Sequence, residues 1–217
     1  MPQAMTLALL ISFGLIWAGA VYFVSGRLLV GDVAKNQIQT TSWLALPLIG
    51  VALPATFVVM LPTSIAAPLS VYVLSGLAIA YWDLVSLRVP RLFCLVVGAL
   101  AITYCAAQFP ERLLVVFLGG AGAAGLLYAA RQHYAAKRGK SGLGGADPVV
   151  FGALVMWLGP YAGLWTLVLG SLLAFGWAQV MSGKAAFASA LVLASWIVIC
   201  VRAWLGQDIF FNSGWGL

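Results

Sequence analysis

Charged residues are scarce in this chain. They make up 7% of its 217 residues, whereas hydrophobic residues make up 64%. A water-soluble domain carries about a quarter of its residues as charged ones, so this chain cannot cover a surface exposed to water. It also has no room for a separate soluble domain. The composition therefore predicts an all-α fold, a polytopic transmembrane helical bundle that forms a single membrane domain over residues 1–217.

Cysteine and histidine are rare as well. Cys94, Cys105 and Cys200 lie inside apolar runs and form no CxxC pair, and His133 is the single histidine. A structural zinc site needs about four ligands of these types, and a disulfide framework needs paired cysteines. We therefore expect neither a metal site nor a disulfide framework.

The net charge of +6 would suggest a nucleic-acid partner if the protein were soluble. Here the basic residues lie in short loops between apolar runs, so the expected partner is the lipid bilayer and not nucleic acid. Two divisions between runs depend on Pro62 and Pro160, because proline interrupts a helix. We expect about eight spans, at residues 4–25, 43–61, 66–82, 92–108, 113–130, 148–163, 164–181 and 185–205.

Lysine and arginine are distributed unevenly between the two sides of these spans. Nine of the 11 fall on one side, and Arg112 and Arg202 fall on the other. Loops rich in Lys and Arg stay in the cytoplasm, so we expect a multi-pass protein of the bacterial inner membrane with both termini outside. The loops expected in the cytoplasm are 26–42, 83–91, 131–147 and 182–184.

Two of the five acidic residues lie at the ends of expected spans. Asp83 closes the apolar run SGLAIAYWD, and Asp147 opens the run DPVVFGALVMWLG. Each has an ordinary interpretation: Asp147 before Pro148 is typical of a helix start, and Asp83 could be an interfacial charge paired with Arg88 or Arg91. In the expected topology both lie at the cytoplasmic ends of their spans, so they could be neighbours in space.

Helix ends also predict how the two carboxyls ionise. A carboxylate at a helix C-terminus meets the negative end of the macrodipole, whereas one at an N-terminus meets the positive end. This favours Asp147 as the anion and Asp83 as the acid, although a nearby Arg88 could reverse the order. An acid held against its electrostatic preference beside a membrane is a candidate functional residue.

The sequence around each aspartate resembles a signature of the prepilin peptidases, which are intramembrane aspartyl proteases of the GxGD class. Asp83 is followed at the seventh position by Pro90, within the run DLVSLRVPRL. The run GLGGAD, residues 142–147, precedes a span that ends in Trp-Leu-Gly at 157–159. The resemblance is specific from about residue 75 to residue 159, and Arg91 stands where the family usually has Asn.

The resemblance implies an aspartic endopeptidase with a peptidase core at about 66–181. It would remove basic leader peptides from type IV prepilin-like or pseudopilin precursors at the cytoplasmic membrane face. Asp83 and Asp147 would be the catalytic pair, one ionised to activate water and one protonated to polarise the carbonyl. The expected substrate-binding residues are Gly142, Gly144, Gly145, Arg88 and Pro90, the glycines because a missing side chain permits close approach and unusual dihedrals.

The same resemblance bears on cofactors. Family members with two activities carry a cysteine-rich N-methyltransferase insert between their first two spans, where this chain has only a short loop, 26–42, without cysteine. We therefore expect no methyltransferase activity and no cofactor. The alternative function is a non-catalytic membrane subunit, or a small proton- or cation-coupled transporter in which Asp83 and Asp147 bind the ion. Ion pathways usually place ionisable groups near the membrane midplane, and no such group is evident here.

Overall fold

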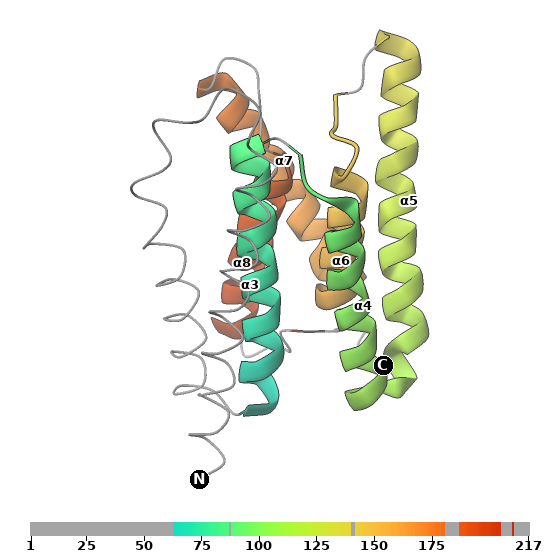
Figure 1. Ribbon diagram of the computed structural model, residues 1–217, viewed down its shortest axis with the longest axis vertical. Helices are drawn as coiled ribbons and strands as arrows, with labels where there is room; N and C mark the ends of the chain where they lie inside the picture. Colours follow the sequence, from blue (N-terminus) through green and yellow to red (C-terminus); the bar gives the residue numbers. More distant parts are fainter. Residues whose placement is uncertain (1–62, 87, 140–141, 181–186, 205–209, 211–217) are drawn as a thin grey trace. The chain divides into compact units, whose positions relative to one another are not determined.

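The computed structural model describes residues 63–86, 88–139, 142–180, 187–204 and 210 (Figure 1). The first two expected spans and the loop between them lie outside these residues. The chain divides into two compact units, Met1–Ala78 and Ile79–Leu217. Both candidate aspartates belong to the second unit.

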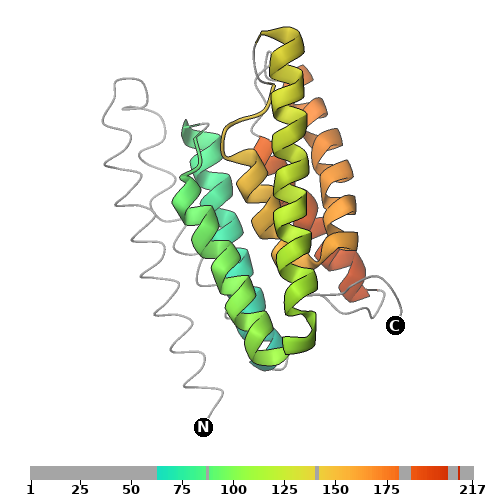
Figure 2. The same ribbon diagram turned by 90° about the vertical axis from the view of Figure 1, so that its right-hand side faces the viewer.

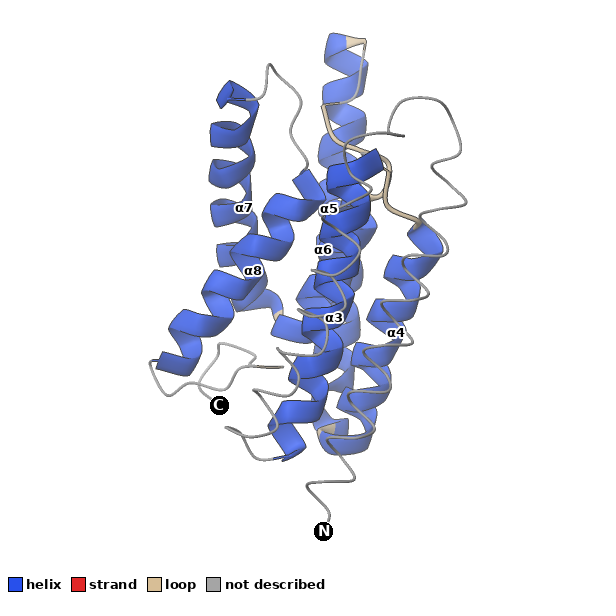
Figure 3. Cartoon of the chain, turned by 60° about the vertical axis from the view of Figure 1, so that its left-hand side comes forward, coloured by secondary structure: helices blue, strands red, loops and turns tan. Residues whose placement is uncertain are grey.

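All regular elements of the described residues are helical, which confirms the all-α expectation there (Figure 3). They are α3 (Thr63–Ser86), α4 (Arg91–Gln108), the short 3-10 helix η1 (Pro110–Arg112), α5 (Leu113–Arg138), α6 (Asp147–Leu158), α7 (Pro160–Val180) and α8 (Phe187–Trp204).

Among the described residues, two helical segments are long and apolar enough to cross a membrane on their own. They are Arg91–Gln108 and Pro110–Arg138, and Figure 2 shows them side by side, joined at one end by a tight turn. The remaining part of the eight-span expectation stays a prediction. At 1.5 Å per residue, the 26 residues of α5 extend about 39 Å, more than the roughly 30 Å of a bilayer's hydrocarbon core. If α5 crosses a bilayer, this length leaves its basic end outside the apolar layer.

The expected spans 148–163 and 164–181 have the wrong boundary. The structure ends α6 at Leu158 and begins α7 at Pro160, because Gly159 has a φ of 83° that ordinary side chains avoid. Pro160 then occupies the first position of α7, where its missing N–H is not needed. With 12 residues, α6 is about 18 Å long and too short to cross a bilayer.

Helix α6 is an interior element of its unit. Ten of its 12 residues are buried, and it packs against α4, α5, α7 and α8 (Figure 1). The expected Trp-Leu-Gly element contributes to this packing: Trp157 is 1% exposed and donates a hydrogen bond from Nε1 to the Val97 carbonyl oxygen of α4, 3.1 Å away. Its ring also stacks on Tyr104. The core is therefore built around α6, and Asp147 lies at its beginning.

Glycines set the spacing between α5 and α6. A Cβ atom added at Gly152 would lie 2.9 Å from both the Gly120 carbonyl oxygen and the Ala124 Cβ atom. Gly120 also lies against α6, with an added Cβ 2.9 Å from the Gly152 carbonyl oxygen, whereas Gly122 and Gly125 have no atom within 4 Å of an added Cβ. Close backbone approach at small residues is typical of helix packing in membranes.

The outer surfaces of α4, α5 and α7 remain apolar. Exposed side chains include Leu92 (74%), Leu114 (67%) and Phe175 (66%). A soluble protein rarely leaves such large apolar patches open to water. The hydrocarbon core of a bilayer would cover these apolar side chains without a free-energy penalty.

Candidate active site

Asp83 lies at the C-terminal end of α3 and is 5% exposed. Its Oδ2 accepts a hydrogen bond from the backbone N–H of Ser189, 2.8 Å away, and lies 3.1 Å from the Ser189 hydroxyl oxygen. Ser189 is the third residue of α8, so its N–H is one of those that a helix leaves without an internal partner. Asp83 therefore faces the positive N-terminal end of α8 as well as the negative end of its own helix, which offsets the penalty expected from the sequence.

Asp147 is the first residue of α6 and is 6% exposed. Its Oδ2 accepts a hydrogen bond of 2.7 Å from the backbone N–H of Gly144, in the loop before the helix. The N-cap position is held by Ala146, without a side-chain capping bond. The carboxylate thus folds back over the glycine-rich loop, and the simple helix-cap interpretation does not describe it.

The two carboxyls act on each other electrostatically. Both lie outside the expected spans and outside the two helical segments that could cross the membrane alone. Burial raises the pKa of each, and the charge of Asp83 adds to the rise for Asp147, whose pKa reaches about 6 in spite of the lowering effects of the Gly144 N–H and Arg131. The N–H groups of Ser189 and Ala188 and the Ser189 hydroxyl lower the pKa of Asp83 against its burial.

This arrangement favours the opposite order of ionisation from the one expected from helix ends. The sequence favoured Asp147 as the anion because it begins a helix. In the structure, Asp83 also meets a helix N-terminus, that of α8, and receives more hydrogen-bond donors than Asp147 does. The donors around Asp83 therefore favour Asp83 as the anion and Asp147 as the protonated carboxyl.

Two arginines flank the loop that leads to Asp147. The Nε atom of Arg131 donates to the Leu143 carbonyl oxygen over 3.2 Å. A Cβ atom added at Gly145 would lie 2.6 Å from Nη2 of Arg91 and 3.9 Å from Nη2 of Arg131. The guanidinium of Arg91 therefore occupies the space that the missing side chain of Gly145 leaves open.

The glycines of this loop are needed for space and not for unusual dihedrals. Among the described glycines, positive φ occurs at Gly139, which ends α5, and at Gly159. A Cβ atom at Gly144 would lie 3.1 Å from Oδ2 of Asp147, and one at Gly142 would lie 3.1 Å from the Tyr134 ring. Close approach, the other reason given for these glycines, thus applies to contacts within the protein.

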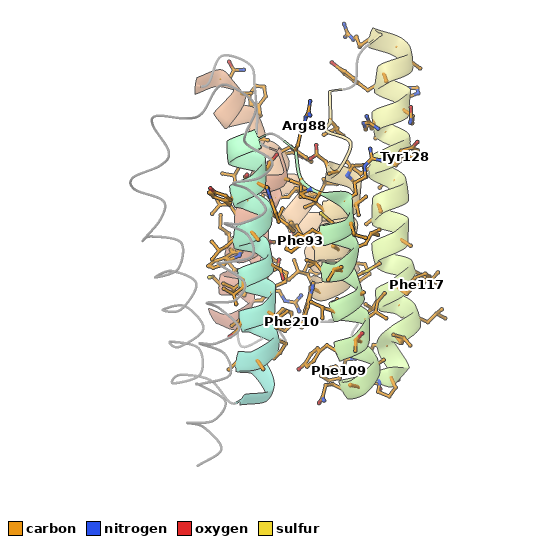
Figure 4. The ribbon with its side chains drawn as sticks, in the orientation of Figure 1. Arg88, Phe93, Phe109, Phe117, Tyr128 and Phe210 are labelled. Atoms are coloured by element: carbon orange, nitrogen blue, oxygen red, sulfur yellow. The ribbon has the colours of Figure 1, made fainter. Side chains whose placement is uncertain are left out.

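Arg88 and Pro90 lie between α3 and α4. Figure 4 shows Arg88 at the same end of the helices as the beginning of α6, with Phe109 at the opposite end. Arg88 is exposed. Pro90 is the N-cap residue of α4 in an extended conformation, and its carbonyl oxygen accepts from the Cys94 N–H. In this structure Pro90 therefore serves to begin α4.

Sequence reasoning missed three residues at this site: Ser189, Arg91 and Arg131. Ser189 lies 106 residues from Asp83 in an unremarkable apolar run, and no local pattern marks it. Arg91 was considered as a partner of Asp83 and as a departure from a motif, and Arg131 was counted only as a topology signal. Within the described part of the chain, no group of three His, Cys, Asp or Glu residues is placed to hold a metal ion.

Comparison with known proteins concerns the same segment. No curated protein and no solved structure matches the chain. The model of the type IV leader peptidase family matches residues 70–179, a range that contains Asp83, Asp147 and the glycine-rich loop and that ends before Ser189. The match spans half of the chain, and the resemblance seen in the sequence is confirmed: this protein belongs to the type IV leader peptidase family, a family of membrane proteases.

Proposed function

We propose that this protein is an aspartic endopeptidase that removes leader peptides from type IV prepilin-like or pseudopilin precursors, with Asp83 and Asp147 as its catalytic pair. One observation carries the proposal. Two buried carboxyls lie within the family segment, and the charge of Asp83 raises the pKa of Asp147, as expected of two acids in one site.

The roles of the two carboxyls follow from their surroundings. Asp83, whose anion is stabilised by the start of α8, takes a proton from a water molecule, and the oxygen of that water attacks the scissile carbonyl carbon. Asp147, protonated up to about pH 6, donates to the carbonyl oxygen. When the tetrahedral intermediate collapses, the C–N bond breaks and the proton on Asp83 passes to the leaving nitrogen. Asp147 takes back a proton from one hydroxyl of the intermediate as the new carboxyl group forms.

The substrate would lie along the loop before Asp147. Gly142, Gly144 and Gly145 keep this loop free of side chains of its own, so that Asp147 and Arg91 pack directly against it. Pro90, the N-cap of α4, follows Asp83 by seven residues. Arg88 and the two arginines that flank the loop are hydrogen-bond donors and cannot accept hydrogen bonds. The main-chain carbonyl groups of the leader are therefore their natural partners. The acidic pair provides the complementary charge for a basic leader.

The location of the reaction follows from charge distribution. The loop before Asp147 belongs to the side that receives nine of the 11 Lys and Arg residues, and the basic end of α5 adjoins it. The active site would therefore face the cytoplasm at the inner membrane. There the basic leader stays in water and the apolar helix of the precursor stays in lipid.

Substitution of each carboxyl tests the catalytic pair. Asp83→Asn and Asp147→Asn should each abolish processing of a co-expressed prepilin on a gel, because one variant lacks the base and the other the tuned acid. Glu111→Gln is the matched control, since Glu111 is an exposed acid with 66% of its side chain accessible and lies in η1 at the far end of α4. Cleavage by either Asn variant, or none by the unmodified protein, would refute the proposal; the second result would favour the transporter or subunit alternative.

The same assay tests the expected lack of methyl transfer. The loop at 26–42 is too short to build a domain with its own core for a large cofactor. The mass of the processed N-terminus should equal that of the unmodified residue, even with S-adenosylmethionine supplied. A methylated product that depends on this protein would contradict the expectation that it lacks methyltransferase activity.

A further inference from the structure

The hydrogen bonds of Ser189 suggest a role for a residue outside the family-matched segment. Its backbone N–H and its hydroxyl both reach the same oxygen, Oδ2 of Asp83, at 2.8 and 3.1 Å. We propose that Ser189 is a positioning residue that fixes the orientation of the Asp83 carboxylate and stabilises its ionised form. This inference rests on the proposed function, because it assigns Ser189 a role in the ionisation of a catalytic carboxyl.

The geometry explains how Ser189 both orients the Asp83 carboxylate and stabilises its ionised form. Two donors from a single residue converge on one oxygen, so rotation of the carboxylate would break both hydrogen bonds. The backbone N–H belongs to the first turn of α8, where the helix dipole also favours an anion. The carboxylate is thereby held in one orientation by an element that lies more than 100 residues away in sequence.

The hydroxyl of Ser189 has a second acceptor. Its Oγ atom lies 3.1 Å from the Ala80 carbonyl oxygen, the same distance as from Oδ2 of Asp83. A hydroxyl has one hydrogen to donate. An ionised carboxylate is the stronger acceptor, so the hydrogen turns to Asp83 when Asp83 is ionised and can turn to Ala80 when Asp83 is protonated. The hydroxyl thus follows the protonation state of the proposed general base.

A purely structural role for Ser189, as a joint between α3 and α8, predicts different consequences. Loss of a joint lowers stability and reduces activity equally at all pH values. Loss of a donor to the ionised form of Asp83 raises its pKa and therefore moves the acidic limb of the activity profile to higher pH. The groups that act on this pair are the N–H groups of Ser189 and Ala188 and the Ser189 hydroxyl from α8, and the Gly144 N–H and Arg131 beside Asp147.

The test uses an isosteric pair of substitutions in the full-length protein. Ser189→Thr keeps the hydroxyl, and Ser189→Val introduces a side chain of nearly the same shape as threonine but without a hydroxyl. Ser189→Ala removes the hydroxyl without added bulk. Ser195→Ala is the matched control, because Ser195 is a buried serine of the same helix whose hydroxyl donates to the Val192 carbonyl oxygen.

Cleavage of a purified prepilin is measured in detergent from pH 4.5 to 8, with thermal unfolding of each variant as a check of folding. Ser189→Ala and Ser189→Val should lower kcat about tenfold at the acidic end, the effect of one hydrogen bond to a charged group. KM should stay unchanged, and the acidic limb should move up by about one pH unit. Ser189→Thr and Ser195→Ala should keep the original profile.

An unchanged pH profile in Ser189→Ala would overturn the inference, and so would an equal loss at every pH that Ser189→Thr fails to restore. Both results leave the proposed function standing if Asp83→Asn and Asp147→Asn are inactive. Cleavage by those Asn variants would instead remove the proposed function itself. The two failures are therefore distinguishable in one set of assays.

Discussion

The backbone N–H of Gly144 donates a hydrogen bond of 2.7 Å to Oδ2 of Asp147, and a Cβ atom at Gly144 would lie 3.1 Å from the same oxygen. The absence of a side chain and the presence of an N–H at one residue thus both serve the same carboxylate. Asp147 lies directly over the loop that the sequence marks as glycine-rich. Its position depends on that loop staying free of side chains.

Gly144→Ala should lower the rate of prepilin cleavage by about tenfold, because the added methyl group displaces a reacting group by a few tenths of an ångström. The rate is measured with purified protein at saturating substrate. Gly145→Ala should have a smaller effect, since the atom it meets is the end of the flexible Arg91 side chain. Gly122→Ala, with open space around its added Cβ, is the control. Equal rates for Gly144→Ala and Gly122→Ala would contradict this account.

Gly152→Ala should destabilise the protein by about 1–3 kcal/mol, the usual effect of overpacking. Its added Cβ would lie 2.9 Å from a backbone oxygen of α5, so the two helices must separate. Thermal unfolding in detergent measures the change. Gly125→Ala introduces the same chemical change on a helix surface with no neighbouring atom within 4 Å, and should not lower the unfolding temperature. If both variants unfold like the unmodified protein, α5 and α6 are not closely packed at Gly152.

The raised pKa of Asp147 predicts a pH dependence of stability. Its pKa is about 6 in the folded protein and near 3.8 when unperturbed, so between these values the folded state binds more protons than the unfolded state. The free energy of unfolding therefore falls as pH rises through this window. Asp147→Asn cannot ionise and lacks this contribution. Its stability relative to the unmodified protein should increase from pH 4 to pH 7, by on the order of 2 kcal/mol.

Thermal unfolding of both proteins across this pH range measures the difference. A constant difference between the two proteins from pH 4 to pH 7 would mean that Asp147 ionises normally. The charge of Asp83 contributes to the shift. In Asp83→Asn, where that charge is absent, the fall in stability should therefore end at a lower pH and be smaller in total.

The orientation of the active site in the membrane can be tested with single cysteines. Gly142→Cys, in the loop before Asp147, should be protected from a membrane-impermeant thiol reagent in intact cells and should react once the cells are opened. Glu111→Cys, in the turn between α4 and α5, should react in intact cells. Native Cys200 is exposed and is replaced beforehand, whereas Cys94 and Cys105 are buried. The opposite labelling pattern would invert the topology and the route by which the substrate arrives.

The sequence by itself determined the class of fold, the family and the two candidate aspartates. Few charges and many apolar residues leave helices in a membrane as the workable architecture, and the runs around Asp83 and Asp147 carry the family resemblance. Pro160 marked the break between α6 and α7 to within a few residues. These features are local, because composition, periodicity and short motifs predict them and none depends on which helices are in contact.

The tertiary structure decided everything that depends on contacts between distant segments. It made α6 a short buried helix, because glycines of α5 and α6 allow close approach and Trp157 bonds to α4. It also brought the N-terminus of α8 to Asp83, which stabilises the Asp83 anion against the order of ionisation expected from helix ends alone. A helix dipole can be assigned from sequence, but which carboxylate it faces depends on packing, and packing brings together residues that no sequence pattern connects.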